Sequence, residues 1–314
     1  MPAPVRAALG ASGGFQHQAL LYSGESGFVD GTLRFIREGL AAREPIQVAV
    51  ANPKIELLRR RLGDQAERVH WTDMAGIGAN PARIIPLWFQ CLERHGGHGP
   101  MRGIGEPIWP ERAPAELEES QHHEALLNLA FATGTDLTLL CPYDIQALAP
   151  AVIDEARRSH PVLVSRNSQR PSSDYRGLEA AAATVTRPLP QPPPTVPEIV
   201  LDDLAPLVLR GFVSDLASRV SLTGGKMEDL LLAVMAVAHG LSDPRSRLRV
   251  WRVDDALVCE IRSTKRIYDP LAGREWPPSD RDSHRGLWVA NQLCNLVQFR
   301  RLDSGTVVRL HMTA

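Results

Sequence analysis

The segment RPLPQPPPTVP, residues 187–197, divides the sequence into two halves with different patterns. Proline has no backbone amide to donate and favours extended polyproline geometry, so such a run does not continue a helix or a central strand. We therefore expect a semi-rigid linker at residues 183–198 between two domains, at 15–182 and 199–314. A chain of 314 residues is long enough for two cores of ordinary size.

Short apolar runs alternate with helical patterns before this segment. Strands are expected at 17–22, 45–51, 68–74, 101–109 and 137–144, and helices at 27–42, 54–63, 84–96 and 115–132. Strands that alternate with helices favour a parallel sheet with helices on both faces. The first half therefore predicts a doubly wound α/β domain.

The order of elements changes after the segment. Two amphipathic helices are expected at 201–220 and 226–241, then a hairpin at 247–263, a helix at 285–297 and a final hairpin at 299–312. Helices followed by antiparallel strands predict an α+β sandwich.

The composition excludes several classes of function. The formal net charge is −1, whereas wrapping nucleic acid or coating an anionic membrane needs concentrated basic charge. No stretch approaches the roughly 20 apolar residues of a membrane span, and we expect a cytoplasmic protein. No helix-turn-helix pattern is present, which disfavours direct contact with DNA.

The cysteines do not suggest a metal centre. Because they show no CxxC spacing, we expect buried thiols and predict neither a disulfide nor a metal site. The four positions are Cys91, Cys141, Cys259 and Cys294.

Several segments of the second half carry a resemblance. ALVCEIRS (256–263), RIYDPLAG (266–273), HRGLWVANQLCNLVQ (284–298) and SGTVVRLHM (304–312) together resemble the GHKL-type ATPase domain of actinobacterial RsbA-family anti-sigma regulators, relatives of the RsbW serine kinases. The resemblance implies a fold that binds ATP and Mg²⁺ between its helices and its sheet. It also implies a catalytic glutamate, a magnesium-binding asparagine and an adenine-binding aspartate.

The sequence departs from that family at these three positions. Ala236 stands at the glutamate, Gly240 at the asparagine and Ser263 at the aspartate. Backbone amides of an Arg-Gly-Leu turn at a helix start, and of the last hairpin, remain as weak contacts for a nucleotide phosphate. These contacts are expected at Arg285, Gly286, Leu287, Gly305 and Thr306. The residues indicate a pseudokinase, and an active ATP-dependent serine or histidine kinase is the alternative.

The first half resembles the DcmR-type sensory domain known as MEDS, from residue 15 to about 180. The resemblance rests on FQHQALLY (15–22), FVDGTLRFIREGL (28–40), RGIGEPIWP (102–110), ESQHHEALLNLAF (119–131) and LLCPYD (139–144), in that order. It implies a RecA- or KaiC-like parallel sheet. SGESGFVDGTLRF (23–35) has the glycines of a P-loop but lacks the lysine of GxxxxGK[ST], so tight nucleotide binding is not expected there.

The candidate ligand-sensing residues are polar groups of this half. The carboxyl ends of parallel strands converge on one crevice, so Tyr22, Glu106 and Asp144 are expected to meet there. Glu119 and His123 lie four residues apart on a helix, where an exposed ion pair is favoured over a metal pair. The predicted set is His17, Tyr22, Glu106, Glu119, His123, Tyr143 and Asp144, with His122 and Glu124 beside it.

Both resemblances together predict a signalling regulator. A sensory domain for an unknown small molecule precedes a module that binds a sigma factor or an anti-sigma-factor antagonist. A homodimer is left open, and so is any nucleotide binding.

Overall fold

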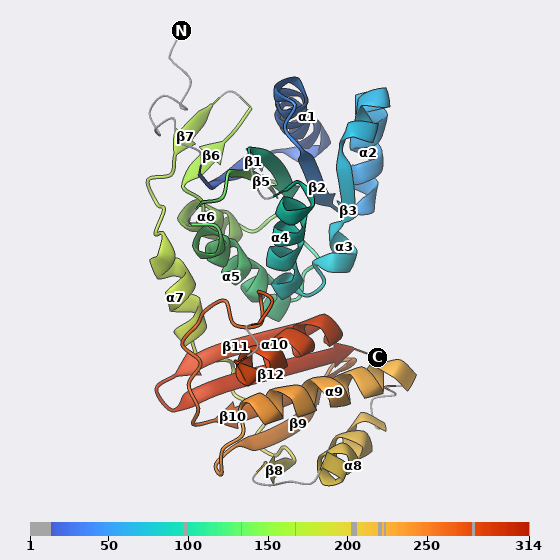
Figure 1. The fold of residues 1–314 in the computed structure, drawn as a ribbon, viewed down its shortest axis with the longest axis vertical. Coiled ribbons are helices and arrows are strands. Elements are labelled where there is room, and N and C mark those ends of the chain that lie inside the picture. Colours follow the sequence, from blue (N-terminus) through green and yellow to red (C-terminus); the bar gives the residue numbers. More distant parts are fainter. Residues whose placement is uncertain are drawn as a thin grey trace. The chain divides into compact units, whose positions relative to one another are not determined.

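Two compact units make up the chain, Met1–Ala181 and Ala182–Ala314. A computed structural model describes residues 14–96, 99–132, 134–166, 168–201, 206–218, 222, 224–277 and 280–313. Each unit is built on its own sheet, with seven strands in the first and five in the second (Figure 1). Within the described ranges, no helix has the length and apolar character that crossing a membrane requires.

The first unit contains a mostly parallel sheet, as predicted. Its strands run in the spatial order β3-β2-β4-β5-β1-β6-β7, and only β6 and β7 pair antiparallel. The strands are β1 (Gln16–Tyr22), β2 (Ile46–Val50), β3 (His70–Asp73), β4 (Met101–Gly105), β5 (Leu137–Asp144), β6 (Val162–Val164) and β7 (Gln169–Pro171).

Helices cover both faces of this sheet (Figure 1). On β4, Ile104 joins the apolar cluster that includes α1 and α2. Gly103 points the other way, where an added Cβ would lie 2.8 Å from the Trp88 ring of α4. Successive strand residues face opposite sides, so α4 packs on the face opposite to α1. The helices are α1 (Gly24–Ala42), α2 (Asn52–Leu62), α3 (Met74–Ile77), α4 (Ile84–Arg94), α5 (Pro114–Ala130) and α6 (Pro150–Ser159), with 3-10 turns η2 (Gly63–Arg68) and η3 (Pro81–Arg83).

The second unit has an antiparallel sheet in the order β11-β12-β10-β9-β8. Its elements are β8 (Glu198–Val200), α8 (Pro206–Ser218), α9 (Gly224–Gly240), β9 (Arg247–Val253), β10 (Ala256–Ser263), α10 (Asp282–Leu293), β11 (Leu296–Leu302) and β12 (Gly305–Thr313). Of the helix expected at 201–220, residues 202–205 and 219–220 lie outside the described residues. Both predicted hairpins are present. The four cysteines are buried thiols, as the sequence analysis predicts.

The helix expected at 285–297 is wrong at its end. α10 stops at Leu293, and Leu296 and Val297 already belong to β11, where they pair with β12. The Asn295 amide donates to the His311 carbonyl at 3.0 Å, which starts this pairing. An apolar run that fits a helix and a buried strand equally well does not reveal where one ends and the other begins.

The proline-rich segment lies along the second unit. It follows α7 (Leu178–Thr186), whose Val185 is part of that unit's core. The Arg309 guanidinium donates to the Pro190 carbonyl, and the Val250 amide donates to the Pro197 carbonyl at 3.2 Å. The residues expected to form a linker are therefore held by hydrogen bonds to the second sheet.

Candidate functional site

A first polar cluster lies at the carboxyl ends of the parallel strands. Tyr22 ends β1, Glu106 directly follows β4, and the Tyr22 hydroxyl donates to Glu106 Oε1 at 3.1 Å. Lys54 Nζ lies 2.5 Å from Glu106 Oε1 and 3.0 Å from the Tyr22 hydroxyl. Asp144 ends β5, and its charge acts on both Tyr22 and Glu106. The structure thus brings together the three residues expected at this edge.

Lys54 is the member of this cluster that the sequence analysis missed. It lies in the first turn of α2, shortly after β2 ends. Because β2 is parallel to β4, its carboxyl end lies at the same edge of the sheet. The position of Lys54 just after β2 could therefore have predicted that it joins the cluster. The Lys54 side chain is 33% exposed, so solvent reaches the cluster on this side.

Burial dominates the electrostatics of the cluster. Glu106 is buried, and burial raises the pKa of its carboxyl although the Lys54 ammonium acts in the opposite direction. Burial, and then the Glu106 charge, raises the pKa of the Tyr22 hydroxyl, which stays protonated as a donor. A buried carboxyl with a raised pKa beside a reachable ammonium is a common feature of ligand sites.

Asp144 also caps the start of α1. Its Oδ1 accepts from the Gly24 amide at 3.4 Å and from the Gln146 amide at 3.0 Å. A P-loop protein places a phosphate at this helix N-terminus, where amides and the helix dipole favour an anion. In this chain the Asp144 side chain, rather than a bound phosphate, accepts the hydrogen bond from the first amide of α1.

Replacing Glu106 with glutamine tests which force sets its pKa. A raised folded pKa means that the unfolded state loses this proton first, so the free energy of unfolding falls as the pH rises above the ordinary value of 4.5. Glu106→Gln has no such proton. We expect the variant to gain stability relative to the wild type between pH 4.5 and pH 8, measured by urea unfolding followed by tryptophan fluorescence. A relative gain by the wild type would mean that pairing with Lys54 outweighs burial.

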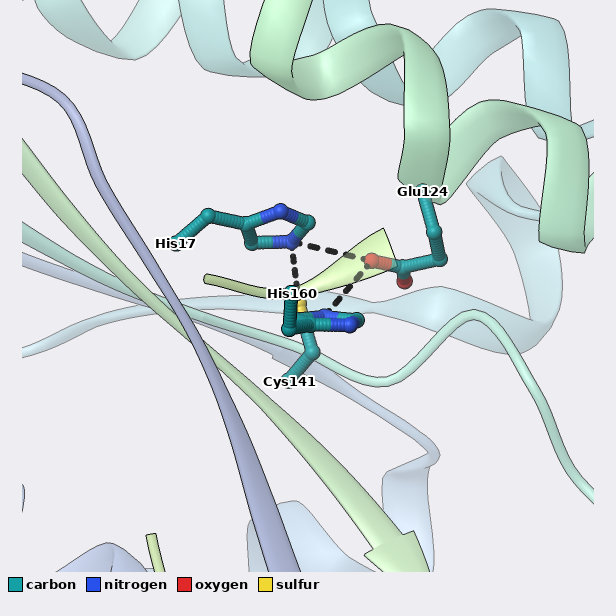
Figure 2. A group of neighbouring side chains, drawn as sticks. All are labelled: His17, Glu124, Cys141 and His160. Atoms are coloured by element: carbon teal, nitrogen blue, oxygen red, sulfur yellow. Dashed lines mark hydrogen bonds and ion pairs between the residues drawn. The ribbon is translucent and has the colours of Figure 1, made fainter. Parts of the chain in front are cut away.

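A second cluster is buried between the sheet and the α5 and α6 side (Figure 2). It contains His17 of β1, Glu124 of α5, Cys141 of β5 and His160, which directly follows α6. His17 Nε2 lies 3.0 Å and His160 Nε2 3.1 Å from the same oxygen, Glu124 Oε2. Cys141 Sγ lies 3.4 Å from His17 Nε2. All four residues are at most 1% exposed.

Hydrogen bonds on the far side of each ring fix both histidines. His17 Nδ1 lies 3.2 Å from Asn128 Oδ1, and the Asn128 amide nitrogen donates to the Ser159 carbonyl at 2.8 Å, which orients that side chain. His160 Nδ1 lies 2.8 Å from the Ala156 carbonyl. Asn128 Oδ1 and the Ala156 carbonyl oxygen both accept hydrogen bonds, so Nδ1 of each histidine carries a hydrogen. When the ring is neutral, Nε2 then has no hydrogen and presents a lone pair.

Burial and mutual contacts set the pKa values of this cluster. Burial, and then His160, lowers the pKa of His17 to about 4, so its ring is neutral near pH 7. Burial opposes ionisation of Glu124, but contacts with His160 and His17 outweigh it and lower the pKa of this carboxyl. Burial and the Glu124 charge raise the pKa of the Cys141 thiol. Contacts with the two histidines therefore favour the ionised form of this buried carboxyl.

Three other predicted residues lie on the same side of the sheet. Glu119 and His123 were expected to form an exposed ion pair, but each is 1% exposed, so this is wrong. Glu119 Oε2 instead lies 3.7 Å from Nδ1 of the buried His122. The buried residues of α5 follow one another almost without a break, so helical spacing alone did not reveal which faces are covered. Tyr143 is buried with its ring edge-on to His160.

His160 and Cys141 were missed as site residues. Cys141 had been assigned to core packing only, and His160 follows a helix with no motif around it. Their partners are distant in the chain: 107 residues separate His17 from Glu124, and 124 separate His17 from Cys141. The parallel pairing of β1 with β5 and β6 brings His17, Cys141 and His160 together, and the packing of α5 on the sheet adds Glu124.

In the second unit, residues at the positions expected to contact ATP pack against other segments of the same unit. An added Cβ at Gly240 would lie 2.6 Å from Ser283 Cα, and one at Gly286 would lie 2.4 Å from the Ala236 carbonyl oxygen. The backbones of α9 and α10 are therefore in direct contact. The Ser263 hydroxyl donates to the Leu241 carbonyl at 2.8 Å and also contacts Asp243.

The expected turn at Arg285, Gly286 and Leu287 is wrong. These residues lie inside α10, which begins at Asp282, and the Arg285 amide already donates to the Arg281 carbonyl at 3.1 Å. Gly305 has a positive φ of 131° where β12 begins, and the buried Thr306 accepts from the Ile267 amide at 3.2 Å through its hydroxyl.

Restoring the magnesium-binding asparagine should damage the fold. Gly240→Asn places side-chain atoms against the Ser283 backbone, so α9 and α10 must separate, and we expect a loss of about 1 to 3 kcal/mol in the free energy of unfolding. Gly211→Asn on α8 is the matched control, because no atom lies within 4 Å of an added Cβ there. Equal unfolding midpoints in urea for the two variants would contradict the close contact.

One comparison with known proteins identifies part of the chain. Residues 16–161 match the family model described as MEDS, MEthanogen/methylotroph, DcmR Sensory domain. A MEDS domain is found here. The resemblance of the first half to this domain is thereby confirmed, and the match, which includes both polar clusters, lies within the first unit. A search of the curated proteins found no match to the chain.

Proposed function

We propose that the protein is a signalling regulator whose MEDS domain detects a small ligand and whose second unit binds a sigma factor or an anti-sigma-factor antagonist. The MEDS match carries the proposal, because a sensory domain acts by changing what another part of the chain does. The second unit has its own core and its own sheet, so it is a suitable output module. A signalling role itself follows from the sensory domain.

We place the ligand of the MEDS domain at the strand-end cluster of Tyr22, Lys54, Glu106 and Asp144. Ligands of open parallel sheets bind outside the carboxyl ends of the strands. The partly exposed Lys54 and the buried Glu106 offer a cation and a hydrogen-bonding carboxyl at that edge. A small polar molecule that displaces one contact of this network would alter the start of α1 through Asp144.

The second unit is proposed as a GHKL-like module without phosphoryl transfer. Two helices followed by antiparallel strands support this fold. Ala236, Gly240 and Ser263 provide neither the base, nor the magnesium ligand, nor the carboxylate for adenine. The direct contact between α9 and α10 further supports loss of the ATP site, and it disfavours an active kinase.

The partner surface is proposed at the segment between β10 and α10. Tyr268 and Trp276 are 66% and 80% exposed, and exposed aromatic side chains are typical of protein interfaces. A cavity of about 680 Å³ beside Tyr268 is also lined by Arg266 and Arg301. An aromatic and basic surface of this kind fits a partner that presents apolar and acidic side chains.

Binding of purified partners tests the proposal. The full chain is immobilised, and the sigma factors and anti-sigma antagonists of the same genome are passed over it one at a time. We expect at least one to bind, and Tyr268→Ala with Trp276→Ala to weaken that binding by tenfold or more, about 1.4 kcal/mol. Val253→Ala, an exposed apolar residue on β9, is the matched control. No binding by any of them would contradict the proposed partner.

Phosphoryl transfer is tested separately on the same preparations. Incubation of the full chain with labelled ATP, Mg²⁺ and each bound partner should leave both proteins unlabelled. Labelled partner would establish the alternative, an active kinase that uses other residues.

A further inference from the structure

We propose that the MEDS domain binds one divalent transition-metal ion of the zinc type through His17, Glu124, Cys141 and His160. The four side chains point toward one another in Figure 2. This inference does not depend on the function proposed above, because it rests only on the geometry within the first unit.

The spacing of the four groups suits a single ion. One ligand atom from each residue, two imidazole nitrogens, a thiol sulfur and a carboxylate oxygen, lies within 4.8 Å of all the others. Zinc bonds of about 2.0 to 2.3 Å in tetrahedral geometry place neighbouring ligand atoms about 3.3 to 3.8 Å apart. The contacts to Glu124 Oε2 of 3.0 and 3.1 Å need to lengthen by only a few tenths of an ångström.

The outer hydrogen bonds of the histidines prepare them as metal ligands. A histidine that binds a metal typically donates its other ring hydrogen to a carbonyl or carboxylate, which fixes its tautomer and orientation. His17 does this toward Asn128 Oδ1, and His160 toward the Ala156 carbonyl. Both Nε2 lone pairs are thereby aimed at Glu124 Oε2, and the lone pairs of three acceptors converge.

Such a convergence requires a positive centre. Nδ1 of His17 faces Asn128 Oδ1 and Nε2 faces Glu124 Oε2, so the contact with Glu124 needs either a proton or a metal cation between the ring and the carboxylate. Among the described residues, Glu124 Oε1 is buried without a hydrogen-bond partner, and the contact of His160 Nε2 with Glu124 Oε2 lacks hydrogen-bond geometry. Unsatisfied polar atoms at this depth are costly, and coordination of an ion would satisfy them.

The charges balance when zinc is bound. The ion displaces the Cys141 thiol proton, which leaves to solvent, and the resulting thiolate and the Glu124 carboxylate offset its two positive charges. Two neutral imidazoles complete a site with no net charge, as a buried site requires. Four protein ligands leave no open position, which is typical of a zinc that holds structure rather than one that activates water.

Cobalt substitution tests both the ion and its ligands. The full chain is purified from cells grown in minimal medium with added Co²⁺, and its metal content and absorption spectrum are measured. We expect one cobalt per chain, the visible bands of tetrahedral Co²⁺, and a near-ultraviolet band from charge transfer between thiolate and cobalt. A chain that carries no cobalt, and no zinc when purified from ordinary medium, overturns the proposal and leaves a proton shared within the cluster.

Matched variants identify the ligands. Cys141→Ser should abolish the charge-transfer band and weaken zinc binding by more than the roughly 10- to 100-fold typical for losing an outer hydrogen-bond partner of a ligand. Cys91→Ser removes another buried thiol of the same unit, outside the cluster, and should leave both unchanged. Glu124→Gln keeps the side-chain size and should lower the affinity as well. An unchanged spectrum in Cys141→Ser overturns the assigned ligand set, and the wild-type spectrum decides the outcome should a variant fail to fold.

Discussion

The convergence of two histidines on one buried carboxylate is the constraint on which the first unit depends. Glu124 comes from helix α5, whereas His17 belongs to β1, an inner strand of the sheet, and His160 precedes β6. Their contacts connect α5 and the end of α6 to the sheet at a place where water has no access. Whatever cation balances the carboxylate therefore also stabilises the packing of helices against strands, which links the site to the fold of the sensory domain.

The second unit is governed by a different constraint, the direct contact of two helix backbones. Gly240 and Gly286 lack side chains where α9 and α10 meet, so the helices approach more closely than any larger residue would permit. The packing of α9 against α10 therefore leaves no space for a side chain at either glycine.

Much of the fold could be predicted from the sequence, because it depends on local periodicity. The alternation of apolar runs and helical patterns predicted the parallel sheet, and the convergence of strand ends predicted Tyr22, Glu106 and Asp144 as neighbours. The end of α10 was missed because Leu296 and Val297 suit either period. His160 was missed for a different reason: its partners come from distant segments, and no local pattern records which strands lie side by side.

The burial of α5 shows the same limit. A helix that carries Glu119, His122, His123 and Glu124 has the composition of a solvated surface, yet the structure covers all four. Helical periodicity specifies the spacing of these groups along the helix but not the layer above it. Of these four, only Glu124 comes within reach of the two histidines and the thiol, from three other segments of the chain.

Anomalous diffraction from crystals of the full chain, measured on both sides of the zinc absorption edge, tests the central claim most directly. The account predicts one strong peak, about 2.0 to 2.3 Å from His17 Nε2, Glu124, Cys141 Sγ and His160 Nε2. Ordered side chains at the distances described above, with no anomalous peak among them, would contradict it.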